Sequence, residues 1–276
     1  MIDLHMHSTA SDGTLTPTEL VEEAKKVGLK VMALTDHDTV DGIKEAKKRA
    51  KELEIEFICG IEFSTEYNGR EVHVLGYFLD ENNEKLLELL DKLKTERIER
   101  TKKILKKLEK YKCYISMEDL EKEVKGDLIS RSHIANAMMA KGFVYSKAEA
   151  FKIYLRTGGL AAEPKKELNA LEAVNFIKSI GGVSSLAHPK LTGLGGGSLE
   201  RLVIELKEQG LDAIEVYYPE QSDKETEIYK KLCDKYELLY TGGSDFHGMN
   251  RPESLLGIKG VSLEELNKLK NRINRV

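Results

Sequence analysis

The sequence predicts an α/β fold, with strands and helices alternating around a barrel, and three observations support this prediction. Short apolar runs typical of buried strands alternate with amphipathic helical stretches, as in parallel α/β folds. The chain has 276 residues and is 41% hydrophobic, and barrels of about this length fold as one domain. Motifs rich in His, Asp and Glu follow most of the strand-like runs. Because parallel strands end at one rim of a barrel, these motifs predict a polynuclear metal site there.

The residue pattern in the first part of the chain predicts four strands and two helices. The strands are expected at Met1–His5, Lys30–Thr35, Glu56–Ile61 and Glu71–Phe78. A helix is expected to begin after Thr16, because Pro17 suits the first helical position and Glu19 completes a capping box, and to stop at Gly28. A Lys-rich helix is expected from Val40 to Leu53.

From residue 83 the pattern changes to helices alone. Apolar residues recur at helical spacing from Leu86 to Leu108, which predicts one long helix. Capping boxes at Ser116 and Ser146 predict two further helix starts, and a helix is expected at Ser130–Lys141. We therefore expect residues 1–82 to form the first part of the barrel, 83–165 a helical insertion and 166–276 the second part.

The alternation of strands and helices resumes after the insertion. Strands are expected at Val183–Ala187, Ala213–Tyr217 and Leu238–Thr241, and helices at Asn169–Ile180, Leu199–Gln209 and Ser222–Tyr236. A capping box that begins at Ser262 predicts the terminal helix.

Composition excludes several classes of protein. The net charge of −4 argues against general basic attraction to a long nucleic acid, but it is compatible with small anionic substrates, because bound cations reverse the local charge. The three cysteines, Cys59, Cys113 and Cys233, are odd in number and far apart, so no disulfide framework is expected. With no signal-like segment and no apolar run of membrane-spanning length, we expect a cytoplasmic protein without membrane partners.

Imidazole and carboxylate groups at the ends of the predicted strands are the ligands that zinc, manganese and iron prefer. The candidate metal ligands are His5, His7, Asp12, His37, Glu62, His73, His188, Asp245 and His247. Taken singly, each has an ordinary explanation: a turn residue for Asp12, or a hydrogen-bonded core histidine for His73. Nine such residues at the same ends of the strands make separate ordinary explanations improbable.

Residues 36–40, Asp-His-Asp-Thr-Val, allow a second interpretation. They fit the D-x-D-x-[TV] motif of phosphatases that use an aspartyl nucleophile, here Asp36, and they follow an apolar strand as that motif does. That class places the motif on its first strand and has no use for the other histidines. We therefore favour the metal site.

Six motifs in this order resemble the polymerase-and-histidinol-phosphatase (PHP) family. They are His-Met-His-Ser-Thr-Ala-Ser-Asp-Gly at 5–13, Leu-Thr-Asp-His-Asp at 34–38, Gly-Ile-Glu-Phe-Ser at 60–64, His-Val-Leu-Gly-Tyr-Phe at 73–78, Ala-His-Pro at 187–189 and Gly-Ser-Asp-Phe-His at 243–247. The resemblance spans essentially the whole chain. It implies a distorted seven-stranded α/β barrel with a trinuclear metal centre.

The resemblance also implies how the ligands divide among three divalent metals, which could be manganese, iron or zinc. One metal would be held by His5, His7, Glu62 and Asp245, a second by Asp12, His37 and His247, and a third by Glu62, His73 and His188. Glu62 would bridge two of them.

Within the family, the insertion resembles the branch that acts on nucleoside bisphosphates and on 5′ ends of short RNAs. The segment 130–135, Ser-Arg-Ser-His-Ile-Ala, carries the likeness, although that branch usually has Arg-Pro-His where this chain has Ser132. The branch also has a Gly-Lys-Pro-Ala-Tyr segment where this chain reads Gly-Gly-Leu-Ala-Ala at 158–162. We expect Arg131 to bind a substrate phosphate and His133 to protonate the leaving oxygen. The alternative is that Arg131 pairs with a surface carboxylate and His133 packs.

The sequence therefore predicts a metal-dependent phosphoesterase whose metal-bound hydroxide attacks a phosphate ester of a small nucleotide or short RNA. A histidinol-phosphate phosphatase of the same fold is one alternative. A catalytically silent metal-binding PHP module is an alternative of another class, disfavoured by the complete ligand set.

Overall fold

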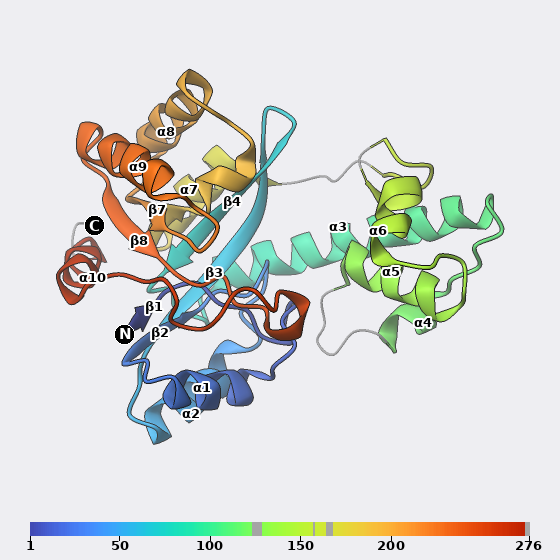
Figure 1. Ribbon diagram of the computed structural model, residues 1–276, viewed down its shortest axis with the longest axis horizontal. Helices are drawn as coiled ribbons and strands as arrows, with labels where there is room; N and C mark the ends of the chain where they lie inside the picture. The colour runs from blue at the N-terminus through green and yellow to red at the C-terminus, as the bar shows by residue number, and fades with distance from the viewer. Residues whose placement is uncertain (123–128, 157, 164–167, 274–276) are drawn as a thin grey trace. The chain divides into compact units, whose positions relative to one another are not determined.

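The computed structural model describes residues 1–122, 129–156, 158–163 and 168–273, and the chain divides into two compact units (Figure 1). The first unit comprises Met1–Leu87 with Glu167–Val276, and the second comprises Glu88–Lys166. All strands of the described residues belong to the first unit, and the described part of the second unit consists of helices joined by loops.

The first unit is built on one sheet with the strand order β1-β2-β3-β4-β6-β7-β8. These strands are β1 (Ile2–Asp3), β2 (Val31–Leu34), β3 (Glu56–Tyr67), β4 (Arg70–Tyr77), β6 (Val183–Leu186), β7 (Ala213–Tyr217) and β8 (Leu239–Gly242). A short strand, β5 (Leu168–Asn169), pairs with β3 outside this path.

The two ends of the sheet approach each other through the segments that follow β1 and β8. Leu4 N donates to the carbonyl of Gly242 at 3.2 Å, and Asp245 N donates to the carbonyl of His5 at 2.8 Å. Met6 and Phe246 form a parallel bridge. The seven strands therefore make a nearly closed barrel, which confirms the predicted fold class.

The expectation of parallel strands throughout was wrong for β3 and β4. They form an antiparallel hairpin with Glu62 opposite Leu75 and Ser64 opposite His73, and β4 also runs antiparallel to β6. The turn between them is Asn68-Gly69, and both residues have positive φ, at 51° and 77°. An Asn-Gly pair favours this two-residue turn because both residues tolerate the left-handed conformation.

Helices lie outside the strands of the barrel (Figure 1). They are α1 (Pro17–Lys26), α2 (Ile43–Glu52), α7 (Ala170–Ser179), α8 (Gly197–Gln209), α9 (Asp223–Lys235) and α10 (Leu263–Lys270), with short 3-10 turns at Pro189–Thr192 and Gly248–Asn250. The predicted capping box of Thr16 and Glu19 is present at the start of α1. Inside the barrel, Leu4, Ala33, Leu75 and Ala213 belong to a buried apolar cluster that also includes Leu266 of α10.

The second unit has a hydrophobic core of its own. Most of α3 (Glu84–Glu109) belongs to it, with α4 (Met117–Glu121), α5 (Arg131–Ala140), α6 (Lys147–Ala150) and a π-helical turn at Phe151–Leu155. Leu108, Leu120, Ile134, Met138 and Leu155 pack together in this core. The burial of these side chains explains why the insertion is an ordered helical unit.

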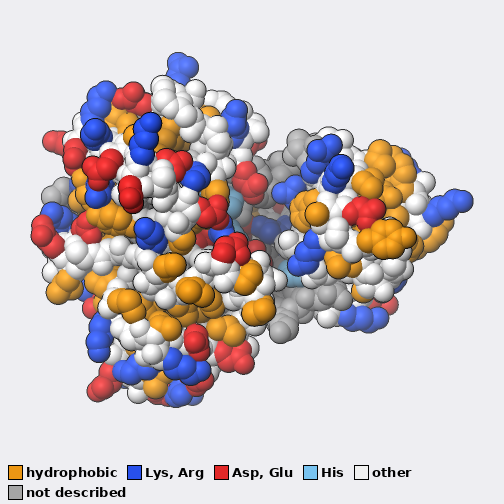
Figure 2. All heavy atoms as spheres, in the orientation of Figure 1, with side chains coloured by type: hydrophobic (Ala, Val, Ile, Leu, Met, Phe, Trp, Pro, Cys, Tyr) orange, Lys and Arg blue, Asp and Glu red, His pale blue; other side chains and the backbone are white. Residues whose placement is uncertain are grey.

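The described residues form no helix that could cross a membrane, and charged side chains of both signs mix on one face of the barrel (Figure 2). No helix there is long and apolar enough to span a membrane. On the face shown in Figure 2, Lys and Arg side chains are interspersed with Asp and Glu over the barrel. This mixture fits the small net charge of −4.

Candidate metal centre

The segment after β1 presents two histidines to one side of the chain. His5, Met6 and His7 are all buried, and the backbone of Met6 bridges to Phe246. Because alternate residues of an extended chain face the same way, His5 and His7 point together. Gly243 allows the neighbouring segment to pass this close, since a Cβ there would lie 2.4 Å from His5 N.

Strands β2, β3 and β4 bring three more side chains to the same place. His37, just after β2, forms a parallel bridge with Glu62. Glu62 lies within β3 rather than after it, because that strand continues to Tyr67. Since β4 runs in the opposite direction, its N-terminal half reaches this end of the barrel, and it carries His73 there.

The turns after β6 and β8 supply the remaining residues. His188 and Asp245 both have positive φ, 24° and 51°, which is uncommon for residues with a side chain and typical of functional sites. The Asp245 carbonyl lies 2.9 Å from Nδ1 of His247, which leaves Nε2 of His247 3.3 Å from Asp12 Oδ1.

Five imidazoles converge on the carboxylate of Glu62, which is fully buried. Oε2 lies 3.0, 3.1 and 3.4 Å from ring nitrogens of His5, His7 and His37, and Oε1 lies 2.9 and 2.8 Å from those of His73 and His188. The histidines therefore divide into two sets, one facing each carboxylate oxygen.

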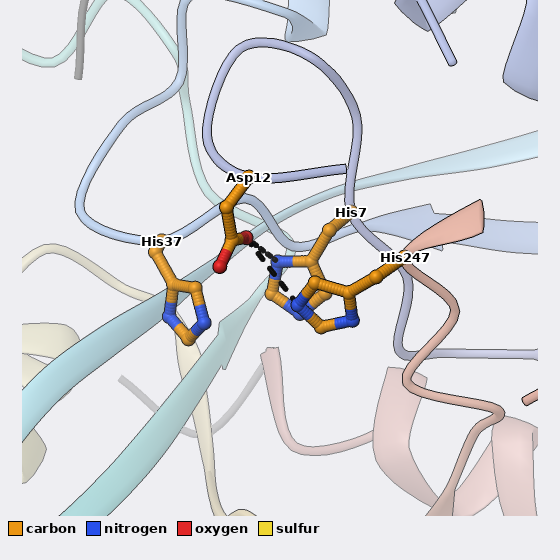
Figure 3. A group of neighbouring side chains, drawn as sticks. All are labelled: His7, Asp12, His37 and His247. Carbon is orange, nitrogen blue, oxygen red and sulfur yellow. Dashed lines mark ion pairs between the residues drawn. The ribbon is translucent and has the colours of Figure 1, made fainter. Parts of the chain in front are cut away.

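Potential ligand atoms gather in three groups within the described residues. These groups are His7, Asp12, His37 and His247; His5, His7, Glu62 and Asp245; and His37, Glu62 and His73. Figure 3 shows the first group, in which Asp12 points toward the rings of His7 and His247. All nine predicted ligands thus lie together, because His188 joins through its contact with Glu62.

Buried ring nitrogens in this cluster lack hydrogen bonds. Both nitrogens of His7, and Nδ1 of His37 and of His188, make none in the structure. Nε2 of His7 nevertheless lies 3.1 and 3.2 Å from carboxylate oxygens of Glu62 and Asp245. Buried polar atoms are usually satisfied. Nitrogens and oxygens that face a common point without hydrogen bonding fit divalent metal ligands.

The charges in the cluster shift its pKa values strongly. Burial alone would lower the pKa of His7, but Asp245 and Glu62 raise it to about 9. Burial likewise opposes the rise for His73, whose pKa Glu62 brings to about 10. Burial dominates for His37 and lowers its pKa to about 4. Burial would raise the pKa of Glu62, but the surrounding histidines hold it well below its usual value. Such opposed shifts are typical of functional sites.

Three residues that the sequence analysis missed contact this cluster. Glu215 Oε1 is 2.9 Å from Nδ1 of His5, and Arg251 donates to Asp245 and, at 2.5 Å, to the hydroxyl of Tyr218. A charged residue inside the apolar run Ala213–Tyr217 was a signal for Glu215. No motif marks Arg251 or Tyr218.

A cavity of about 240 Å³ opens onto the cluster. It is lined by His37, Glu62, Glu71, His73, His188, Leu191, Thr192, Asp245, His247 and Arg251. Arg251 is the single Lys or Arg among these described lining residues. The barrel therefore offers a small cavity with imidazoles, carboxylates and one guanidinium on its walls.

The candidate nucleophile Asp36 does not face this cavity. Its carboxylate is buried and accepts hydrogen bonds from Ser8 and Ser11, and Asp38 accepts from the backbone N–H of Ser64 at 2.9 Å. Both carboxylates of the D-x-D-x-[TV] match therefore hold loops and strands together.

Arg131 and His133 lie in the first turn of α5, in the second unit. Arg131 Nη1 donates to the carbonyl of Leu155 at 3.4 Å, and its guanidinium lies 5.9 Å from the ring centre of Phe151. His133 Nδ1 accepts from the backbone N–H of Ser130 at 3.0 Å, as part of a capping box. Both side chains thus have partners within their own unit.

Comparison with known proteins identifies the family. The model of the PHP domain matches residues 3–159. A 5′-3′ exoribonuclease from Haemophilus influenzae is 36% identical over 245 residues, or 89% of each chain. The chain belongs to the PHP family. A 3′,5′-nucleoside bisphosphate phosphatase from Chromobacterium violaceum is 31% identical over 247 residues, 89% of this chain and 87% of that protein.

A solved structure supports the same relationship. A protein from Bifidobacterium adolescentis described as a metal-dependent phosphoesterase aligns with a TM-score of 0.86 at 29% identity, over 98% of this chain and 96% of that one. The predicted family and its likeness to exoribonucleases and bisphosphate phosphatases are therefore confirmed. The names of all three PHP proteins denote hydrolysis of phosphate esters, which confirms the predicted enzyme class.

Proposed function

We propose that this PHP protein hydrolyses phosphate esters of small nucleotides or short RNAs at a centre of three divalent metals. The convergence of five imidazoles on the buried carboxylate of Glu62 supports this proposal most directly. Structural networks alone would satisfy these buried nitrogens with hydrogen bonds, and several of them make none.

The family resemblance suggests which residues would hold each metal. The first set is His5, His7, Glu62 and Asp245; the second is Asp12, His37 and His247; the third is Glu62, His73 and His188. In the structure the ligand atoms of the first and of the second set lie close together, with His7 also near the second set; His37 groups with Glu62 and His73, and His188 contacts Glu62. The two oxygens of Glu62 face different histidines, which suits a bridging carboxylate. Divalent metals bound here would activate water and polarise the phosphate oxygens of a substrate.

The chain itself would supply further contacts to the substrate. Arg131 carries a fixed positive charge suited to a phosphate, and His133, two residues further along the same helix, would donate a proton to the leaving oxygen. Arg251 supplies positive charge to the wall of the cavity. The cytoplasmic location expected from the sequence stays a prediction.

The relatives favour nucleotides as substrates. The two similar proteins are named for action on RNA and on nucleoside 3′,5′-bisphosphate, and each aligns over 89% of this chain. Histidinol phosphate is the competing substrate within the same fold. A silent metal-binding module would not need the complete set of nine ligands.

A phosphate-release assay tests the proposal. The protein, loaded with manganese, iron or zinc, would be given nucleoside 3′,5′-bisphosphates, mononucleotides, 5′-phosphorylated short RNA and histidinol phosphate. We expect turnover of a nucleotide or RNA and three metal equivalents by elemental analysis. Preference for histidinol phosphate would overturn the substrate, a single metal at saturation would overturn the trinuclear centre, and no turnover with any metal would favour the silent module.

A further inference from the structure

Glu215 is a fully buried carboxylate inside the barrel. It is the third residue of β7, between Ile214 and Val216, and it is 0% exposed to solvent. Taking a charge out of water is costly unless strong hydrogen bonds replace the lost hydration. An apolar side chain would fill a core position without this cost, so the presence of Glu215 calls for a role.

Both oxygens of Glu215 contact residues of the candidate metal centre. Oε1 is 2.9 Å from Nδ1 of His5, and Oε2 accepts a hydrogen bond from the backbone N–H of His188 at 2.7 Å. The two imidazoles stack, with ring centres 5.6 Å apart and an interplanar angle of 24°. One carboxylate therefore holds two neighbouring histidines at the same time.

The contact with His5 determines which of its nitrogens can bind a metal. A neutral imidazole carries one N–H, and a carboxylate at Nδ1 favours the tautomer with the proton there. The lone pair is then on Nε2. This nitrogen lies 3.0 Å from Glu62 Oε2 and 3.3 Å from Asp245 Oδ1, where the first metal set converges.

The contact with His188 holds its backbone. His188 has φ 24° and ψ 66°, a conformation that a residue with a side chain rarely adopts and that needs support from its surroundings. The hydrogen bond to Glu215 supplies such support. In this conformation, Nε2 of His188 lies 2.8 Å from Glu62 Oε1, on the side of the third metal set.

We propose that Glu215 is a positioning residue that couples two of the three metal sites. Through His5 it acts on the first set, and through His188 it acts on the third. Within the described residues, the hydrogen bonds of its carboxylate go to His5 and His188 and to none of Asp12, His37 and His247. This inference rests on the proposed metal centre and adds a dependence between two of its sites.

The substitution Glu215→Gln tests the coupling with almost no change in shape. Both partners of Glu215 donate hydrogen bonds, but a carboxamide offers one accepting oxygen and one donating NH₂ group. If the NH₂ group faces His5, the proton of that ring moves to Nε2 and blocks the metal ligand. If it faces His188, two donors meet and the strained backbone loses its support.

Asp212→Asn is the matched control. Asp212 precedes β7 and accepts a hydrogen bond from the backbone N–H of Ser184 at 3.1 Å, as Glu215 does from His188. Its carboxylate contacts no candidate metal ligand in the described structure. The same change of carboxylate to carboxamide therefore occurs beside the same strand pair, without the proposed coupling.

Calorimetric titration of each metal-free protein with Mn²⁺ measures the result. We expect wild type and Asp212→Asn to bind three ions with equal affinity profiles. In Glu215→Gln, two of the three sites should weaken together by about 10- to 100-fold, the usual effect of losing an outer-sphere partner. Unchanged binding, weakening of one site alone, or equal loss of all three would overturn the coupling.

The tautomer of the His5 ring gives a second measurement, which would not change if Glu215 merely stabilised the fold. In zinc-loaded protein with ¹⁵N-labelled histidine, the His5 ring should show Nδ1–H and a metal-bound Nε2, and this signal should be lost or altered in Glu215→Gln.

If Glu215→Gln does not fold, Glu215→Asp keeps the charge but is too short to reach both partners, and the same two measurements apply. A wild-type protein that binds no metal would overturn the proposed function itself, whereas a wild type with three ions and an unaffected variant would overturn this inference alone.

Discussion

The carboxylate of Asp36 accepts two hydrogen bonds from Ser8, one from its backbone N–H and one from its hydroxyl, both at 2.7 Å. Ser11 donates a third at 2.6 Å. These bonds tie the loop after His7 to the end of β2. The loop also carries Asp12, so Asp36 helps to place a candidate metal ligand rather than attack a substrate.

This arrangement predicts the behaviour of Asp36→Asn. An amide cannot accept all three bonds, so the free energy of unfolding should fall by about 1–3 kcal/mol, measured by denaturant unfolding. Turnover should fall less than in His5→Ala, because the metal centre generates the nucleophile. Asp41→Asn, at an exposed position, is the control. Labelled phosphate trapped covalently on Asp36 would show that the aspartyl-nucleophile interpretation was right.

Metal uptake should release protons. In the metal-free protein the pKa of His7 is raised to about 9 and that of His73 to about 10, so both rings are charged at pH 7. A metal binds the neutral ring, so binding must displace these protons. The heat of Mn²⁺ binding at pH 7 should therefore depend on the ionisation enthalpy of the buffer. Binding heats that are the same in every buffer would contradict this prediction.

The raised pKa of His7 should also make the stability of the metal-free protein depend on pH. Because the folded pKa of His7 lies above its ordinary value of 6.5, its ion pairs stabilise the fold fully below pH 6.5. That contribution is lost as the pH rises through about 9. The melting temperature of the metal-free protein should fall between pH 6.5 and about 9. The melting temperature of metal-free His7→Ala should fall less over the same interval.

Arg131→Ala tests the role of the insertion. Losing one charge-assisted contact to phosphate typically costs ~1.5–3 kcal/mol, so kcat/KM should fall by roughly 10- to 150-fold. Metal content should stay at the wild-type value, because Arg131 contacts Leu155 and Phe151 within its own unit. Lys152→Ala, an exposed residue of the same unit, is the control. An unchanged kcat/KM would assign Arg131 to stability, and a loss of metal would make it a support of the metal centre.

Arg251→Met should also lower kcat/KM. The guanidinium donates to Oδ2 of Asp245, while Oδ1 faces His5 and His7 at 3.3 and 3.2 Å. Without it, Asp245 keeps the hydroxyl of Tyr218 but can turn away from the histidines. We expect a loss of roughly 10-fold or more, the scale of one charged hydrogen bond, and a smaller loss in Arg251→Lys. Activity equal to wild type in a steady-state assay would remove Arg251 from the working site.

The sequence by itself was enough for the features that depend on neighbours in the chain. The predicted capping boxes at Thr16, Ser116 and Ser262 form as their spacing predicts, because each needs only residues three positions apart. The family motifs and the nine candidate ligands could likewise be identified from the sequence, because each motif is a short run of neighbouring residues. The hairpin of β3 and β4 was also marked locally by Asn68-Gly69, but the expectation of parallel strands concealed it.

The tertiary structure alone decided which distant residues meet. Glu215 contacts His5 across 210 positions, and Arg251 reaches Tyr218 across 33 positions from a loop without a motif. The sharing of Glu62 among five imidazoles likewise depends on how the barrel closes between the segments after β1 and β8. Local spacing carries no information about such contacts, because strand order, register and direction set them only when the whole sheet has formed.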